Sequence, residues 1–306
     1  MALSDNSRGI LYMNIAMATF TLNDTFMKLA TQSVPLSQAI AMRGTLTVVL
    51  LLILGRIMGV RQWGAAPADR PVLALRTVAE VAATITFLLA LRQMPLANLS
   101  AILQSLPLAV TLGAALLLGE PVGWRRMTAI LIGFCGVLLI VRPGTEGFNI
   151  WSVLGLASVA CVVVRDLATR RFSTALPSVT IALYSAVAVT IMGYAGLGLE
   201  EWTMVTTSEA TLLVGASSML IVGYLFIVMA MRGGDVAIIA PFRYVALIWA
   251  IALGWLAFGV FPSGWTLLGA GIVVATGLYT YLREYQLQRR IAASRSSLTG
   301  TATPDR

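Results

Sequence analysis

The residues that could do chemistry in this chain are ionisable side chains placed inside long apolar runs. Asp24 and Lys28 stand four residues apart, and Asp166 and Arg170 repeat that spacing 142 residues later. Four residues apart on a helix means one shared face. A charged side chain inside a bilayer costs about 2.5 to 3.5 kcal/mol on insertion scales, so each needs a partner or a water-filled cavity. The pattern predicts ion pairs near the membrane faces.

Such pairs favour a gating function. Two further arginines, 140 residues apart, end the third and eighth apolar runs, one on each side of the membrane. We therefore expect two gates that close in alternation, the outer one formed by Asp24 with Lys28 or Arg92, and the inner one formed by Asp166 with Arg170 or Arg232. The same residues also fit static pairs that fix the helix ends at the interfaces.

Deeper polar and aromatic positions are the candidates for substrate contacts. An amino acid offers a carboxylate that a buried arginine binds, and aromatic faces line an apolar pocket. Gln104 and Tyr244 share the 140-residue offset, which places them in corresponding parts of a repeat. The predicted contacts are Arg43, Glu80, Gln104, Tyr224, Arg243, Tyr244 and Trp249. For the aromatic residues, packing between helices is the alternative, and Arg76, on the same helix face as Glu80, can simply neutralise it.

Two prolines interrupt apolar runs. Pro107 and Pro241 each lack the N–H that a continuous helix needs, so each should bend its helix and free a carbonyl group. These bends are candidate hinges. Prolines also occur in membrane helices purely as architectural bends.

The elements that position these residues follow from composition. Hydrophobic residues make up 58% of the 306 positions and charged ones 11%, against roughly 25% charged in a soluble domain. Apolar runs of about 20 residues recur along the chain without the alternation of barrel strands, so they indicate membrane-spanning helices. We expect ten, near 9–30, 35–57, 71–93, 96–118, 124–142, 149–169, 177–198, 209–231, 236–258 and 264–284.

Arginines concentrate on the loops that share a side with the N-terminus, which predicts cytoplasmic termini. The net charge of +8 is thus mostly topological, and the lipid bilayer, rather than nucleic acid, is the expected partner. The polar segment 286–306 is expected to be a disordered cytoplasmic tail. Oligomeric state is left open.

The chain also shows an internal repeat. Ala90-Leu91-Arg92 matches Ala230-Met231-Arg232, and Gly119 matches Gly259, at an offset of 140. With one more inserted residue, Gly123-Trp124 matches Gly264-Trp265. An odd number of helices per copy inverts the second copy. We therefore predict an all-α membrane protein with ten transmembrane helices in two inverted five-helix repeats, 1–144 and 145–285.

Several chemistries are missing from the sequence. There is no histidine and no GxxxxGK[ST] phosphate loop, and Cys135 and Cys161 stand far from any CxxC spacing. We therefore expect no enzyme activity, no catalytic residue, no cofactor and no metal, and a secondary carrier rather than an ATP-driven pump. A channel or a membrane-embedded enzyme is the alternative from a different class.

The stretch from Ala90 to Gly144 resembles a known family. Its short turn 92–97, the run Leu118-Gly119-Glu120-Pro121 and the closing Arg142-Pro143-Gly144 are similar to the EamA-type, tandem-repeat branch of the drug/metabolite transporter superfamily. Val260 stands where a second copy of Glu120 would fall, so a structural role is expected for Glu120. The resemblance implies a bacterial inner-membrane carrier of small organic metabolites such as amino acids, often outward, with one branch exporting aromatic amino acids. Nucleotide-sugar or other metabolite exchange is the alternative that it leaves.

Overall fold

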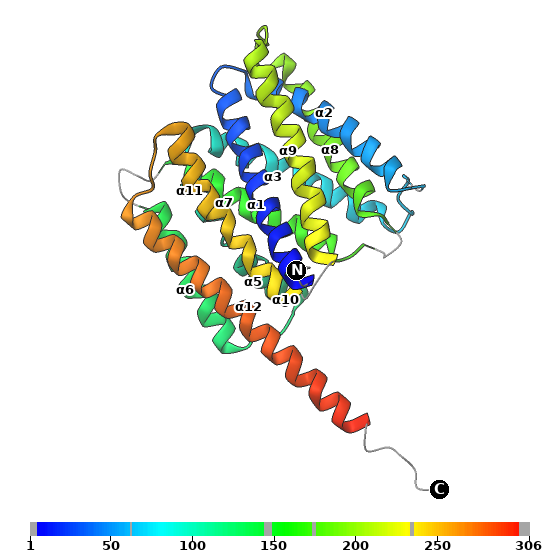
Figure 1. Cartoon of the computed structure of the whole chain (residues 1–306), viewed down its shortest axis with the longest axis vertical. Helices are drawn as coiled ribbons and strands as arrows, with labels where there is room; N and C mark the ends of the chain where they lie inside the picture. The colour runs from blue at the N-terminus through cyan, green and yellow to red at the C-terminus, as the bar shows by residue number, and fades with distance from the viewer. Residues whose placement is uncertain (1–4, 62, 144–148, 173–175, 233–235, 300–306) are drawn as a thin grey trace.

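The protein is a bundle of long helices. The computed structural model describes residues 5–61, 63–143, 149–172, 176–232 and 236–299, and within these ranges it contains helices and turns but no strand. The ribbon in Figure 1 shows the helices running roughly side by side, with α12 extending beyond the bundle. This arrangement confirms the predicted all-α class.

In the described ranges the helices form ten rod-like units, two of them interrupted. Their bounds are α1 (Asp5–Ala30), α2 (Leu36–Ile57), α3 (Arg70–Gln93), α4 (Leu96–Leu103) with α5 (Leu106–Leu118), α6 (Trp124–Val141), α7 (Ile150–Thr169), α8 (Ser178–Ala195) with the 3₁₀ turn η1 (Gly196–Gly198), α9 (Thr207–Arg232), α10 (Val236–Ile239) with η2 (Ala240–Tyr244) and α11 (Val245–Phe258), and α12 (Gly264–Thr299). These rods correspond to the ten apolar runs.

Nine rods in the described part of the chain are long and apolar enough to cross a membrane. The tenth, α1, carries polar residues along its length, including Asn23, Asp24 and Lys28. Figure 1 shows α1 between α9 and α11, and it packs against both helices. Its polar side chains therefore face other helices rather than lipid, which explains why this span is less apolar than the rest.

The packing of the helices has the symmetry of two equivalent halves. The first half consists of α1, α2, α3, α4–α5 and α6, and the second half consists, in the same order, of α7, α8, α9, α10–α11 and α12. With helices paired in this order, each major helix–helix contact has an equivalent contact. The pair α1–α9 corresponds to α7–α3, α1–α11 to α7–α5, and α2–α9 to α8–α3. The pairs α2–α8 and α6–α12 are their own counterparts. This is the contact pattern expected of an inverted repeat.

Helix ends match at the offsets found in the sequence. Gly119 ends α5 with φ 68°, and Gly259 ends α11 with φ 66°. Both lie in the left-handed region, where a side chain is strained and glycine is not. Pro35 and Pro177 likewise occupy equivalent positions, as the N-caps of α2 and α8.

Both predicted prolines lie beside a break in a helix. Pro107 is in the first turn of α5, three residues after Gln104, where α4 has ended. Pro241 is in η2, three residues before Tyr244, where α11 is about to begin. The expected bends are present, while a hinge function for them stays a prediction.

The far end of the chain departs from expectation. Helix α12 continues to Thr299, so the prediction of a disordered tail is wrong for residues 286–299; residues 300–306 lie outside the described part. The polar composition of this segment favours exposure to water, and an exposed helix is as compatible with that composition as a coil is. That this end is cytoplasmic remains a prediction.

A close helix contact gives a testable consequence for stability. Helices α6 and α12 approach each other at glycines, and a Cβ on Gly269 would come within 2.5 Å of the carbonyl oxygen of Gly136. Because small residues allow such backbone approach in membranes, we expect Gly269→Leu to destabilise the protein by about 1 to 3 kcal/mol, as overpacking does. Gly271→Leu, on the same helix with no atom within 4 Å of its Cβ position, is the matched control.

The measurement is the melting temperature of the purified protein in detergent. Gly269→Leu should lower it clearly, whereas Gly271→Leu should leave it nearly unchanged. Equal melting temperatures for the two variants would show that the α6–α12 contact is not as close as described.

Candidate functional site

A cavity of about 320 Å³ lies among α1, α2 and α3 of the first half and α7, α8 and α9 of the second half. Helix α2 begins on the side of the bundle away from the termini, and Arg43 lies about 10 Å along the helix from that beginning. Arg76 and Arg165 lie within about two turns of the helix ends on the side of the termini. The cavity therefore extends from the middle of the bundle toward the side of the termini.

Charged groups crowd the part of the cavity nearest the termini. The Arg165 guanidinium is 3.3 Å from the Glu80 carboxylate, and that of Arg76 is 3.7 Å from it. Arg165 also binds Asp166 at 2.9 Å. Arg76 in turn donates to the hydroxyls of Thr169 and Ser185. The two acids and two arginines thus form one connected network that joins α3 to α7 and α8.

Arg43 is in a different electrostatic situation. Its Nη1 donates to the Asn23 side-chain oxygen at 3.3 Å. Its Nε is buried and has no hydrogen-bond partner among the described residues. No carboxylate of the described part of the chain lies within ion-pair distance of it, although Asp24 and Glu80 are near enough to act on its charge. A buried donor without a partner costs free energy, so Arg43 is poised to bind an anionic group.

The rest of the lining combines apolar surface with hydroxyl groups. Phe20, Leu220 and Ile221 supply apolar surface, and Thr47 and Tyr224 supply hydroxyls. A few polar groups fixing the orientation of a ligand on an apolar wall is the usual composition of a small-molecule site, and 320 Å³ is at the lower end of the usual size range of about 300 to 1,000 Å³.

Of the seven predicted substrate contacts, the structure brings three together in this cavity: Arg43, Glu80 and Tyr224. The other four do not line it. Gln104 is buried at the end of α4, and Arg243 is exposed in η2. The Tyr244 hydroxyl is buried beside Gly277. Trp249 donates to Asn14 at 3.0 Å.

The predicted outer gate has different partners from those expected. The Lys28 ammonium donates to the carbonyl oxygens of Leu91 at 2.6 Å, Arg92 at 3.3 Å and Met94 at 2.8 Å. It therefore caps the end of α3 instead of pairing with Asp24. Arg92 is exposed, and only its backbone joins this contact. Free carbonyls at a helix end attract a cation strongly, so the tertiary contact prevails over the one within α1.

The predicted inner gate is also arranged differently. Asp166 pairs with Arg165, its neighbour in sequence, rather than with Arg170. Arg170 is half exposed and lies 3.4 Å from Glu120. The Arg232 side chain lies outside the described residues. The pairing Asp166–Arg170 is therefore wrong for this conformation, while a gating role for these residues stays a prediction.

Arg165 and Ser185 are site residues that the sequence pattern did not single out. Arg165 interrupts an apolar run directly before Asp166, and that position alone could have marked it. Its position is equivalent to that of Asn23, 142 residues earlier. Ser185 is likewise equivalent to Arg43. The first half thus contributes Arg43 on α2 and Arg76 on α3 to the cavity, whereas the second half contributes Arg165 on α7.

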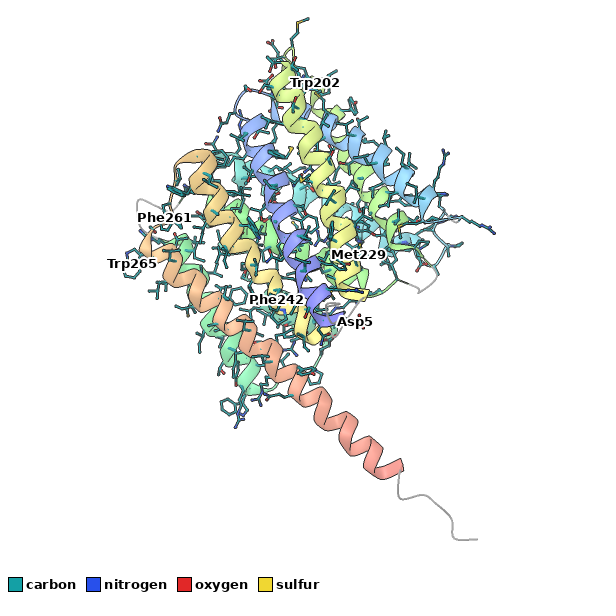
Figure 2. The ribbon with its side chains drawn as sticks, in the orientation of Figure 1. Asp5, Trp202, Met229, Phe242, Phe261 and Trp265 are labelled. Atoms are coloured by element: carbon teal, nitrogen blue, oxygen red, sulfur yellow. The ribbon has the colours of Figure 1, made fainter. Side chains whose placement is uncertain are left out.

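The side away from the termini is closed by contacts between the halves. The Ser37 backbone N–H donates to Glu200 at 2.8 Å, and the Gln38 side chain exchanges two hydrogen bonds with the Thr203 backbone at 2.8 and 3.0 Å. Ser33 binds Glu209 there as well. Figure 2 shows Trp202, Phe261 and Trp265 along this side of the bundle and Asp5 on the other. The cavity is therefore covered on the side away from the termini.

These features are those of a polytopic membrane transporter: two inverted halves, a central cavity with charged groups at their junction, and one side closed. Residues 7–142 match the model of the EamA-like transporter family. The first half of the chain is therefore similar to this family, and the relatives reported next are named as transporters.

Named relatives extend the similarity beyond the first half, to as much as 90% of the chain. The pseudopaline exporter CntI of Pseudomonas aeruginosa is 26% identical over 283 residues, which cover 90% of this chain and 96% of the relative. A riboflavin transporter of Vibrio cholerae is 30% identical over 191 residues, 62% of this chain and 64% of the relative. The S-adenosylmethionine uptake transporter of Rickettsia conorii is 27% identical over 201 residues, 64% and 66%.

A solved crystal structure has the same fold. It superposes with a TM-score of 0.63 at 22% sequence identity, covering 91% of this chain and 98% of the other. The named relatives and the family matched by the first half indicate that the protein is a membrane transporter for a small metabolite.

Proposed function

We propose that the protein exports amino acids or related small metabolites that carry a carboxylate, by alternating access through the cavity at Arg43. The observation that carries this proposal is the buried Arg43 Nε, which has no partner among the described residues although it borders a cavity of about 320 Å³. A substrate carboxylate would supply the missing acceptor. Charge-assisted hydrogen bonds of this kind are among the strongest in proteins.

The other lining residues complete the assignment. The Glu80 carboxylate, although held by two arginines, is the acid of the cavity lining and suits the ammonium group of an amino acid. Tyr224, Phe20 and Ile221 offer surface for an aromatic or aliphatic side chain. This arrangement favours a zwitterion with an apolar part, and aromatic amino acids fit the description well.

The described conformation represents one end of the transport cycle. The cavity extends toward the side of the termini, and the other side is closed by hydrogen bonds between α2 and the segment before α9. With the termini in the cytoplasm of a bacterial cell, the substrate would enter from the cytoplasm. Exchange of the equivalent contacts between the two halves then gives the outward-facing state.

The relatives support transport but differ in direction and substrate. One is named an exporter and another an uptake transporter. Because a carrier works in either direction according to the gradients, export here means that the substrate is more concentrated inside. The size of the cavity favours amino acids over larger metabolites.

The test is flux into liposomes that contain the purified protein, with radiolabelled aromatic, small and charged amino acids. Saturable flux of an amino acid supports the proposal. A folded protein that moves riboflavin, a nucleotide sugar or another metabolite, and no amino acid, would overturn the substrate assignment. Linear flux without saturation would indicate a channel.

A further inference from the structure

Asp24 borders a second, much smaller cavity. This space of about 20 Å³ lies between α1, α3 and α4, and Thr21 and Ser100 line it together with apolar side chains such as Phe87 and Leu91. Its volume suits about one water molecule. It is too small for any organic substrate, so the carboxylate that faces it serves another purpose.

The partners of Asp24 distinguish it from the other acids within the bundle. Glu80 and Asp166 each form an ion pair with Arg165. Asp24 accepts one hydrogen bond, from the Asn23 amide nitrogen at 2.9 Å. No cation of the described part of the chain lies within 4 Å of it. An ionised carboxylate without a counter-ion is costly in such surroundings, and uptake of a proton removes that cost.

The charged groups around Asp24 can be assigned helix by helix. On α1 itself, the Lys28 ammonium is directed to the carbonyls at the end of α3. On α2, Arg43 acts on Asp24 from beyond hydrogen-bond distance. On α3, Phe87 and Leu91 face the cavity, Glu80 is paired with Arg76 and Arg165, and the Arg92 side chain is exposed. The helices α4 and α11 carry no charged residue, and Glu209 of α9 is held at the bundle end by Ser33 and Thr206.

One amide joins Asp24 to the substrate cavity. The Asn23 side chain donates from its nitrogen to Asp24 and accepts at its oxygen from Arg43, at 2.9 and 3.3 Å. Arg43 borders the large cavity. The two hydrogen bonds that link Asp24, Asn23 and Arg43 therefore connect the small cavity with the proposed carboxylate site.

We propose that Asp24 is the proton-binding site of the transport cycle, and that its proton and the substrate carboxylate at Arg43 bind together. This inference rests on the proposed function. In the step, a proton from water forms an O–H bond with an Asp24 carboxylate oxygen, and no other bond changes. A carboxylate at Arg43 adds negative charge near Asp24, which favours the protonated form. Conversely, a neutral Asp24 leaves the Arg43 charge free for the substrate.

The sign of the coupling has a consequence for direction. Because proton and substrate load together, they cross the membrane in the same direction. An inward proton gradient therefore favours uptake, and export proceeds when the outward gradient of the substrate exceeds it. The small cavity lies beneath the Lys28 contact, so movement of α3 and α4 away from α1 would expose Asp24 to the far side.

The experiment compares wild type, Asp24→Asn and Glu201→Gln in liposomes. Glu201 is an exposed acid on the same side of the bundle, outside the closing contacts named above, and serves as the matched control. With an acidic exterior and a neutral interior, we expect the initial rate of amino-acid uptake to rise about tenfold in wild type and in Glu201→Gln. Asp24→Asn should lose this stimulation while retaining exchange of labelled for unlabelled substrate. Equal stimulation in Asp24→Asn, or none in wild type, would overturn the inference.

A second readout is independent of transport. Infrared difference spectra of the proteoliposomes between acidic and alkaline pH should contain the C=O band of a protonated carboxyl group in wild type, and Asp24→Asn should lack it. The band requires no substrate. Absence of amino-acid flux with this band present would overturn the proposed function alone, whereas an identical band in Asp24→Asn would overturn the proton site.

Discussion

Replacing Arg43 with alanine should reduce amino-acid uptake at low substrate concentration by about thirtyfold or more. Loss of one member of a buried charge pair costs about 2 kcal/mol or more, which corresponds to that factor. Arg43→Lys should recover only part of the activity, because an ammonium cannot form the paired hydrogen bonds of a guanidinium. The measurement is the concentration dependence of initial uptake rates in liposomes.

Arg56→Ala provides the matched control for Arg43→Ala. Arg56 is an exposed arginine near the other end of the same helix, outside the cavity. Its removal should leave uptake within about twofold of wild type, because exposed charges contribute little. Wild-type kinetics in Arg43→Ala, with correct folding shown by its melting temperature, would exclude Arg43 as the carboxylate site.

The second large effect is expected from replacing Lys28, and it concerns the access of water to the small cavity. Its ammonium joins α1 to the corner between α3 and α4 through three carbonyl oxygens at 2.6 to 3.3 Å. Hydrogen bonds to charged groups are worth about 1.5 to 3 kcal/mol each. Lys28→Met should therefore weaken the closure above the small cavity and raise the access of water from the side away from the termini at least tenfold.

Access can be measured at Ser100, which lines the small cavity. The measurement is the rate at which Ser100→Cys reacts with a membrane-impermeant thiol reagent, after Cys135 and Cys161 are replaced by alanine. Arg92→Met is the control, since Arg92 is a cation at the same corner whose exposed side chain joins none of these contacts. An equal rate increase in Arg92→Met, or none in Lys28→Met, would contradict a closing role for Lys28.

The spans were predictable because the bilayer imposes a requirement that sequence shows directly. Helices must be about 20 apolar residues long, and their ends carry punctuation such as Gly119 and Gly259. The repeat was visible for the same reason, since equivalent ends keep equivalent residues. The helix over residues 286–299 was not predictable from composition. A polar composition indicates that a segment is exposed to water, but it does not distinguish an exposed helix from a coil.

The pairings within the site were less predictable. Spacing places Asp24 and Lys28 on one helix face, but a long side chain can reach backbone carbonyls of another helix, as Lys28 does. These acceptors carry no signature in sequence, because every residue has a carbonyl. The four-residue spacing favours Arg170 as the partner of Asp166, whereas the structure pairs Asp166 with Arg165, its neighbour in sequence. The helix rotations that direct Arg43 into a cavity and Arg243 away from it depend on tertiary packing.

The most direct test of the account is counterflow. Liposomes containing the protein are loaded with a high concentration of unlabelled amino acid, and a trace of the labelled compound is added outside at equal pH. The account predicts that the label accumulates transiently above its external concentration, because a single site alternates between the two sides, and that Arg43→Ala abolishes this overshoot. A label that only equilibrates would contradict alternating access, and an undiminished overshoot in Arg43→Ala would place the site elsewhere.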